Sequence, residues 1–133
     1  MQTPVLIMVP LAALLCACAV SDMPEPPEGE ALFRENCAAC HGYDGAGGGT
    51  LVGGQRSPDL TQLAARNDGV FPRAQVLSQI DGYGRGKVSA DVMPQFGALL
   101  EGDLVPVEVD GTLTPTPRPL AALLVYLENI QTP

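Results

Sequence analysis

The chain has 133 residues and a formal charge of −8, which suits one domain and argues against a nucleic-acid partner, because phosphates attract basic surfaces. The acidic charge either keeps a small domain soluble or favours protein partners with a basic docking face. With 15 Gly, 13 Pro, no Trp, three Phe and three Tyr, we expect many loops and an interior that an apolar cofactor would help to fill.

An apolar run without charged side chains, MQTPVLIMVPLAALLCACAV, occupies residues 1–20 and ends in small residues. This pattern indicates an export signal, although no Lys or Arg precedes the run. Ala17-Cys18-Ala19 fits the small-x-small cleavage rule, whereas Leu15-Cys16-Ala17-Cys18 resembles a bacterial lipobox. We favour the second interpretation and expect a signal peptide over residues 1–19 and a periplasmic protein. Its favoured form is anchored to the membrane by lipid on Cys18, and the alternative is cleavage after Ala19.

Residues 20–29, which include SDMPEPPEG, are rich in Pro and Glu and lack an apolar pattern. They predict an extended, solvated tether, with a disordered leader as the alternative if Cys18 is removed. A domain over residues 30–133 would follow. Its first helix is expected over Glu30 to Ala39, because GEALFRENC has helical character, and it would break at the cysteines.

The motif Cys37-x-x-Cys40-His41 is the first with specific chemistry. A structural zinc site usually needs a second cysteine pair, but export would leave only Cys37 and Cys40 as internal cysteines, and His41 is the only histidine. A thioredoxin-like redox pair would follow a β-strand in a βαβ frame, which the preceding residues do not suggest. Covalent haem attachment fits better: both thiols would add to the vinyl groups of one porphyrin, and His41 would ligate the iron.

The stretch after this motif, GYDGAGGGTLVGG (Gly42 to Gly54), is glycine-rich. No strand precedes it and no Lys-Ser/Thr follows it, so it is not a phosphate loop. Its glycines would let the backbone pass close to a porphyrin edge. Arg56 is a candidate partner for a haem propionate, and a solvated arginine is an equal alternative.

A middle helix is predicted after Pro72, over Arg73 to Gln79, with apolar side chains at Val76, Leu77 and Ile80. Tyr83, in DGYGRGKV, is a second polar candidate near the haem edge.

The second iron ligand can be sought by elimination. No second histidine exists, Met1 and Met8 lie in the signal, and Met23 lies in the tether. This leaves Met93, in ADVMPQFG, where Pro94 stiffens the loop. A His/Met pair raises the reduction potential relative to two histidines and closes the iron to small molecules. The alternative is that Met93 fills a gap in the core.

The C-terminal third predicts a hairpin and a helix. LVPVEVDGTLTPTP (Leu104 to Pro117) alternates valines with other residues before Asp-Gly, which indicates a β-hairpin. The helix is expected over Leu120 to Gln131, where leucines recur at helical spacing. Tyr126 lies on a face of this helix that would meet Phe33.

In this order, GEALFRENCAACHG, SPDL, VMPQFG and LAALLVYLENIQ resemble the class I c-type cytochromes of bacteria, from about Gly29 to the C-terminus. The resemblance implies an all-α, cytochrome c-like fold of three to four short helices, with long loops, around one covalently bound haem c. A hairpin over residues 104–117 departs from a minimal member.

The resemblance also assigns roles to single residues. It implies that Met93 in its Met-Pro pair supplies the distal sulfur, that the carbonyl of Pro58 accepts a hydrogen bond from the haem-ligating histidine, and that Leu60 packs against the haem face. It further implies that Gly29 and Phe33 cross the terminal helix.

These inferences favour a monomeric one-electron carrier, not an enzyme, in a periplasmic or membrane-surface chain. Its partners would be redox proteins with basic docking faces. One alternative is a cytochrome subunit of a larger dehydrogenase or oxidase complex. The other is a haem peroxidase or gas sensor in which Met93 is labile.

Overall fold

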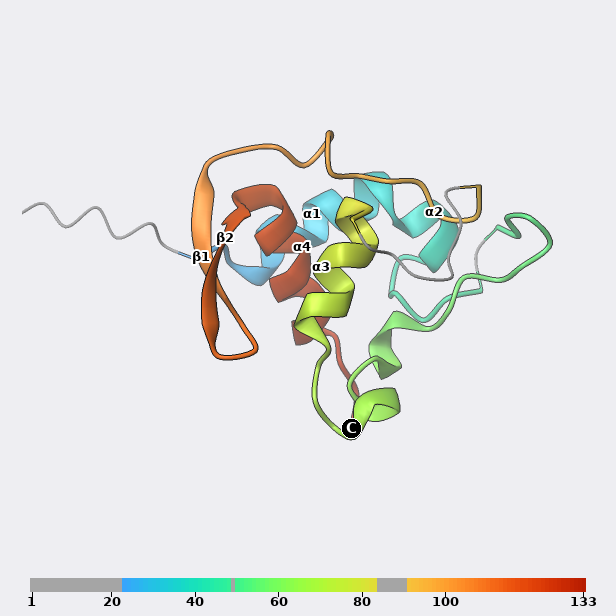
Figure 1. Cartoon of the computed structure of the whole chain (residues 1–133). Coiled ribbons are helices and arrows are strands. Elements are labelled where there is room, and N and C mark those ends of the chain that lie inside the picture. The colour runs from blue at the N-terminus through green and yellow to red at the C-terminus, as the bar shows by residue number, and fades with distance from the viewer. Residues whose placement is uncertain (1–22, 49, 84–90) are drawn as a thin grey trace, which may run out of the picture.

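The computed structural model describes residues 23–48, 50–83 and 91–133. Short helices dominate these residues (Figure 1). They comprise α1 (Pro26–Asn36), α2 (Ala38–His41), η1 (Leu60–Gln62), η2 (Ala65–Asn67), α3 (Arg73–Asp81) and α4 (Arg118–Asn129), where η marks a 3₁₀ helix. Strands β1 (Leu104–Val109) and β2 (Thr112–Pro117) form one hairpin. The predicted helical fold with long loops and a small hairpin is therefore confirmed.

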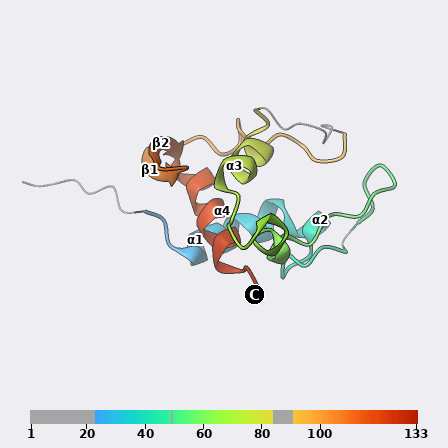
Figure 2. The same cartoon turned by 60° about the horizontal axis from the view of Figure 1, so that its bottom comes forward.

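The first and last helices cross at the centre of the fold, as Figures 1 and 2 both show. An ideal Cβ at Gly29 would lie 1.9 Å from the carbonyl oxygen of Ala122, so only glycine permits this close crossing. One turn later, the rings of Phe33 and Tyr126 pack with centroids 5.2 Å apart and a tilt of 47°. The expected crossing of Gly29 and Phe33 with the terminal helix is confirmed.

The start of α1 differs from the expectation. The helix begins at Pro26 rather than Glu30, so residues 26–29 are helical and not part of an extended tether. Proline suits the first helical turn because it has no N–H to leave unpaired. Glu28, in the same turn, accepts hydrogen bonds from Arg118 at 3.0 and 2.9 Å, which ties the helix start to α4. The predicted signal peptide over residues 1–19 lies outside the described residues.

Helix α4 supplies much of the core. It begins at Arg118, two residues before the predicted start at Leu120, and ends at Asn129. Its buried side chains are Leu120, Ala121, Ala122, Leu123, Leu124, Tyr126 and Leu127, which cover most of its circumference because α1, α3 and the hairpin all pack on it. Within the described residues, no helix has the length and apolar character that a membrane span requires.

Helix α3 begins after Pro72, as predicted, and continues to Asp81. Val76 and Ile80 are buried against the core, and Leu77 is half-buried. The helix ends where Gly82 takes a left-handed φ of 99°, a conformation that glycine adopts without steric cost.

The hairpin packs one face on α4. Its antiparallel register pairs Val105 with Thr116 and Val107 with Thr114, and Val105, Val107 and Thr116 are buried. Asp110 and Gly111 connect the strands with φ values of 49° and 80°, the left-handed pair that a two-residue hairpin turn requires. The predicted hairpin over residues 104–117 is confirmed.

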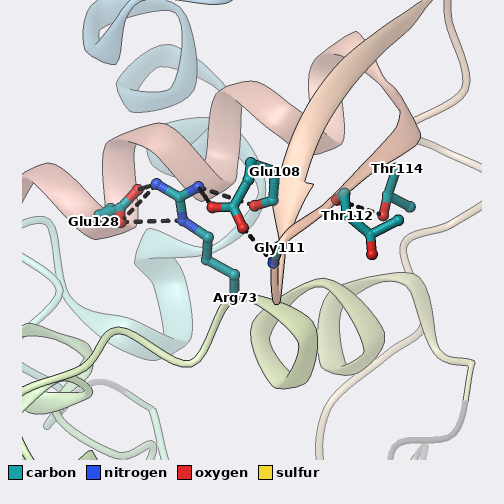
Figure 3. A network of polar contacts seen from close by, with 6 residues as sticks. All are labelled: Arg73, Glu108, Gly111, Thr112, Thr114 and Glu128. Carbon is teal, nitrogen blue, oxygen red and sulfur yellow. Dashed lines mark hydrogen bonds and ion pairs between the residues drawn. The ribbon is translucent and has the colours of Figure 1, made fainter.

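An arginine at the start of α3 fastens the hairpin to the helices (Figure 3). Arg73 donates to both carboxylate oxygens of Glu128 on α4, at 2.9 to 3.2 Å. Its other terminal nitrogen donates to the carbonyl oxygen of Glu108 on β1 at 2.9 Å and forms an ion pair with the Glu108 carboxylate at 3.3 Å. One guanidinium thus joins three elements.

Candidate functional site

The Cys37–His41 segment forms one tight turn between two helices. Cys37 ends α1 and precedes α2, and its carbonyl oxygen accepts hydrogen bonds from the backbone N–H of Cys40 at 3.1 Å and of His41 at 2.9 Å. Both cysteines are half-buried and neither forms a disulfide. The turn therefore presents two free thiols and one imidazole within five consecutive residues.

The environment of Cys37 does not suit a redox-active thiol. Burial, helped by the nearby Cys40, raises the pKa of Cys37 to about 11. Reactive cysteine pairs instead lower the pKa of the attacking thiol so that it ionises near neutral pH. Among the described residues, no three His, Cys, Asp or Glu side chains are grouped so that they could hold a metal ion.

The loop from Gly42 to Pro58 returns to His41 and brings the Pro58 carbonyl beside its imidazole. Its Nδ1 atom is buried, and no hydrogen-bond partner for it lies among the described residues. Burial lowers the pKa of the imidazole, and the backbone carbonyl of Pro58 opposes this by favouring the protonated ring. The carbonyl thus lies beside the imidazole without completing a hydrogen bond. Histidine ligands of metals commonly donate their second ring N–H to a backbone carbonyl, and the Pro58 carbonyl is the one that affects this ring.

Two glycines bring the Pro58 segment to His41. Gly47 donates its N–H to the carbonyl oxygen of His41 at 2.9 Å, and an ideal Cβ on Gly47 would lie 2.7 Å from the carbonyl oxygen of Ser57. Gly45 accepts a hydrogen bond from the N–H of Leu60 at 2.7 Å. These glycines pack the loop against residues 57–60, and the close approach of this stretch to a porphyrin edge stays a prediction.

Residues 59–61 are further fixed by a local cap. One carboxylate oxygen of Asp59 accepts from the hydroxyl of Thr61 at 2.6 Å and from its backbone N–H at 2.8 Å. These two bonds lower the pKa of Asp59. Leu60, between Asp59 and Thr61 in the sequence, is half-buried and packs against the hydrophobic core.

Met93 approaches the core from a different part of the chain. It is half-buried against the core, and its sulfur accepts a hydrogen bond from the side-chain amide of Gln79 on α3 at 3.5 Å. Sequence reasoning missed Gln79, since a single glutamine in a predicted helix carries no signal of a partner. The contact ties the thioether to α3.

A shell of half-buried apolar side chains accompanies these groups. Partly buried apolar side chains from several elements pack against the core: Leu32, Cys37, Leu60, Leu63, Phe71, Leu77, Met93, Phe96, Val109 and Ile130. Apolar surface that is left partly exposed favours contact with an apolar group. Together with two free thiols, an imidazole whose Nδ1 atom is buried and a thioether, this shell fits a haem.

Two predicted site residues are not part of this shell. Arg56 is exposed. Tyr83 is 83% exposed and lines a groove between α3 and the hairpin. Their contacts with haem propionates or a haem edge stay predictions.

Comparison with known proteins gives two findings. A family model described as cytochrome c matches residues 27–105, which include the cysteine turn and Met93 and end at the start of the hairpin. Cytochrome c6 from Aphanizomenon flos-aquae is 32% identical over 77 residues, which are 58% of this chain and 75% of that protein. No solved structure matches the chain.

Proposed function

Because the chain belongs to the cytochrome c family, we propose that it carries single electrons on one haem c with axial ligands from His41 and Met93. Haem supplies an iron that gains and loses one electron without net change in the protein. The observation that supports the proposal is the turn that presents two free cysteine thiols directly before a histidine, within the stretch that matches the cytochrome c model.

Each side chain has a distinct task in this proposal. Cys37 and Cys40 would form thioether bonds that fix the porphyrin to the turn after α1. His41 would bind iron through Nε2, with its Nδ1–H directed to the carbonyl of Pro58, which lies beside the ring. That carbonyl would fix the tautomer and make the imidazole a stronger donor.

Met93 would close the opposite axial position. The hydrogen bond from Gln79 fixes its sulfur, and Pro94 restricts the backbone beside it. If His41 and Met93 both held the iron, small molecules would find no open site on it. Outer-sphere electron transfer is then the chemistry that the residues support.

The location that fits this proposal is outside the cytoplasm, since the sequence predicts an export signal. The lipid anchor on Cys18 and a place in a membrane-surface chain belong to the same proposal. A cytochrome subunit of a larger complex is the second candidate function, and the hairpin favours it. Leu104 and Leu113 on the hairpin are exposed, and such apolar surface is what a partner chain in a complex would cover.

The axial ligand is tested by Met93→Ala in the haem-loaded protein. We expect loss of the low-spin ferric spectrum, a lower reduction potential and rapid binding of cyanide or carbon monoxide. Met23→Ala is the matched control, because Met23 is 39% exposed and precedes the family match. A pyridine haemochrome spectrum and the mass of the mature protein report the haem linkage and the cleavage site. An unchanged spectrum and potential in Met93→Ala would show that another group binds the iron.

A further inference from the structure

A groove separates the C-terminal half of α3 from β2. Its volume is about 380 Å³. Leu77, Ser78, Asp81 and Tyr83 line it from the side of α3, and residues 114–117 and Leu120 line it from the side of the hairpin and α4. Figures 1 and 2 both place the hairpin and α2 on different sides of α3 and α4. A partner in this groove would therefore leave the cysteine turn accessible.

The free edge of β2 offers the groove acceptors and almost no donors. Pro106 and Pro115 face each other in the register, and because neither has an N–H, this pair cannot be a hydrogen-bonded one. Pairs alternate along an antiparallel ladder, so Leu113 and Pro115 direct their free backbone groups outward, whereas Pro117 is the N-cap of α4. Only Leu113 among them has an N–H. The missing N–H groups disfavour the addition of another strand at this edge. The outward carbonyls stay free to accept hydrogen bonds from another kind of group.

The side chains that line the groove also offer hydrogen-bond acceptors rather than donors. Thr116 is buried, and its hydroxyl donates to the carbonyl oxygen of Thr114 at 3.0 Å, so it offers no free donor to the groove. Asp81 takes part in none of the ion pairs among the described residues. The Asp81 carboxylate lies close to the backbone of Gly97, where an ideal Cβ would be 2.5 Å from one of its oxygens. None of the described residues that line the groove is Lys, Arg or His.

Apolar surface adjoins these acceptors. Leu77, Leu120, Pro115 and Pro117 supply apolar walls to the groove, and the outer face of the hairpin continues them, with Leu113 67% exposed. A long basic side chain combines an aliphatic stem with a head group that only donates hydrogen bonds. The stem matches the apolar walls of the groove, and the head group matches the Asp81 carboxylate. The overall charge of −8 adds a favourable potential.

We propose that this groove binds an arginine side chain of a protein partner, whose neighbouring apolar residues cover the outer face of the hairpin. The guanidinium pairs with the Asp81 carboxylate and the outward carbonyls of β2. The site serves a partner that stays attached while electrons are exchanged elsewhere on the surface. It extends the proposed function and does not depend on the identity of the axial ligands.

The test is a titration of the reduced, haem-loaded, ¹⁵N-labelled protein with two millimolar peptides, followed by NMR. The probes are acetyl-Leu-Arg-Leu-amide and its citrulline counterpart, which has the same shape without the charge. We expect amide shifts concentrated at residues 77–82 and 113–118, and binding of the arginine peptide tighter by about fivefold. Asp81→Asn should abolish this preference, whereas Asp68→Asn, the same charge change at an exposed site, should keep it.

A further variant separates the two parts of the surface. Leu113→Ser should weaken both peptides equally, because it removes apolar contact only. Shifts spread over the whole surface, the absence of shifts in the groove, equal affinity for both peptides, or equal effects of Asp68→Asn and Asp81→Asn would each overturn the proposal. The visible spectrum reports haem ligation in the same samples, so a failure of the proposed function is seen separately.

Discussion

At the scale of single residues, the amide of Gln79 holds the Met93 sulfur by a hydrogen bond of 3.5 Å. Such a bond draws electron density from the sulfur and weakens its donation to ferric iron, so it raises the reduction potential. Gln79→Leu should lower the potential by about 40 mV if the bond contributes 1 kcal/mol, as measured by voltammetry. Gln75→Leu, exposed on the same helix, is the control. Equal potentials in the two variants would show that the contact does not tune the iron.

Asp59 makes the Pro58 segment sensitive to acid. Hydrogen bonds from the hydroxyl and then the backbone N–H of Thr61 lower its pKa. A carboxylate with a folded-state pKa below its unfolded value of about 3.9 contributes stability above that pH and loses it as the pH falls through the folded pKa. Denaturant unfolding of the haem-loaded protein between neutral and acid pH should therefore show a smaller loss in Asp59→Asn than in the wild type. Asp68→Asn should leave the profile unchanged, and equal profiles in all three would contradict the assignment.

At the scale of elements, the crossing of α1 and α4 depends on the missing side chain of Gly29. A Cβ there would lie 1.9 Å from the carbonyl oxygen of Ala122, and a backbone atom cannot move aside as a flexible side chain does. Gly29→Ala should lower the free energy of unfolding by about 3 kcal/mol, measured with denaturant on the haem-loaded protein. Glu35→Ala, exposed on the same helix, should change it by less than about 0.5 kcal/mol. A stable Gly29→Ala protein would mean that the helices can separate at low cost.

Elements with a strong local pattern could be predicted from the sequence. The leucine repeat indicated α4, and the valine alternation before Asp110-Gly111 indicated the hairpin, because periodicity and turn chemistry act over a few residues. The predicted ends of the helices were less accurate than the predicted elements themselves. The sequence did not reveal that α1 starts at Pro26, because proline and glutamate are typical both of tethers and of first helical turns. Contacts between distant residues, such as Gln79 with Met93 or Arg73 with Glu128, leave no local signal.

At the scale of the whole molecule, the fold separates two surfaces. The cysteine turn and the loops around it lie at one side, and the hairpin lies on another side of α3 and α4 (Figures 1 and 2). Arg73 fixes the hairpin to α3 and α4 through Glu108 and Glu128 (Figure 3). These bonds and the burial of Val105 and Val107 hold the hairpin against α3 and α4. A partner held by the hairpin would therefore be held at a fixed position relative to the cysteine turn.

The acidic charge predicts how electrons are exchanged with small reagents. No charged side chain precedes Asp22, so removal of a signal peptide would keep the formal charge of −8. In stopped-flow oxidation of the reduced protein, added salt should slow the reaction with cationic tris(phenanthroline)cobalt(III) and speed the reaction with anionic ferricyanide, because screening weakens attraction and repulsion alike. If the two reagents instead respond to salt in the same direction, the surface through which electrons leave does not share the charge of the whole molecule. A physiological partner would then not need a basic face.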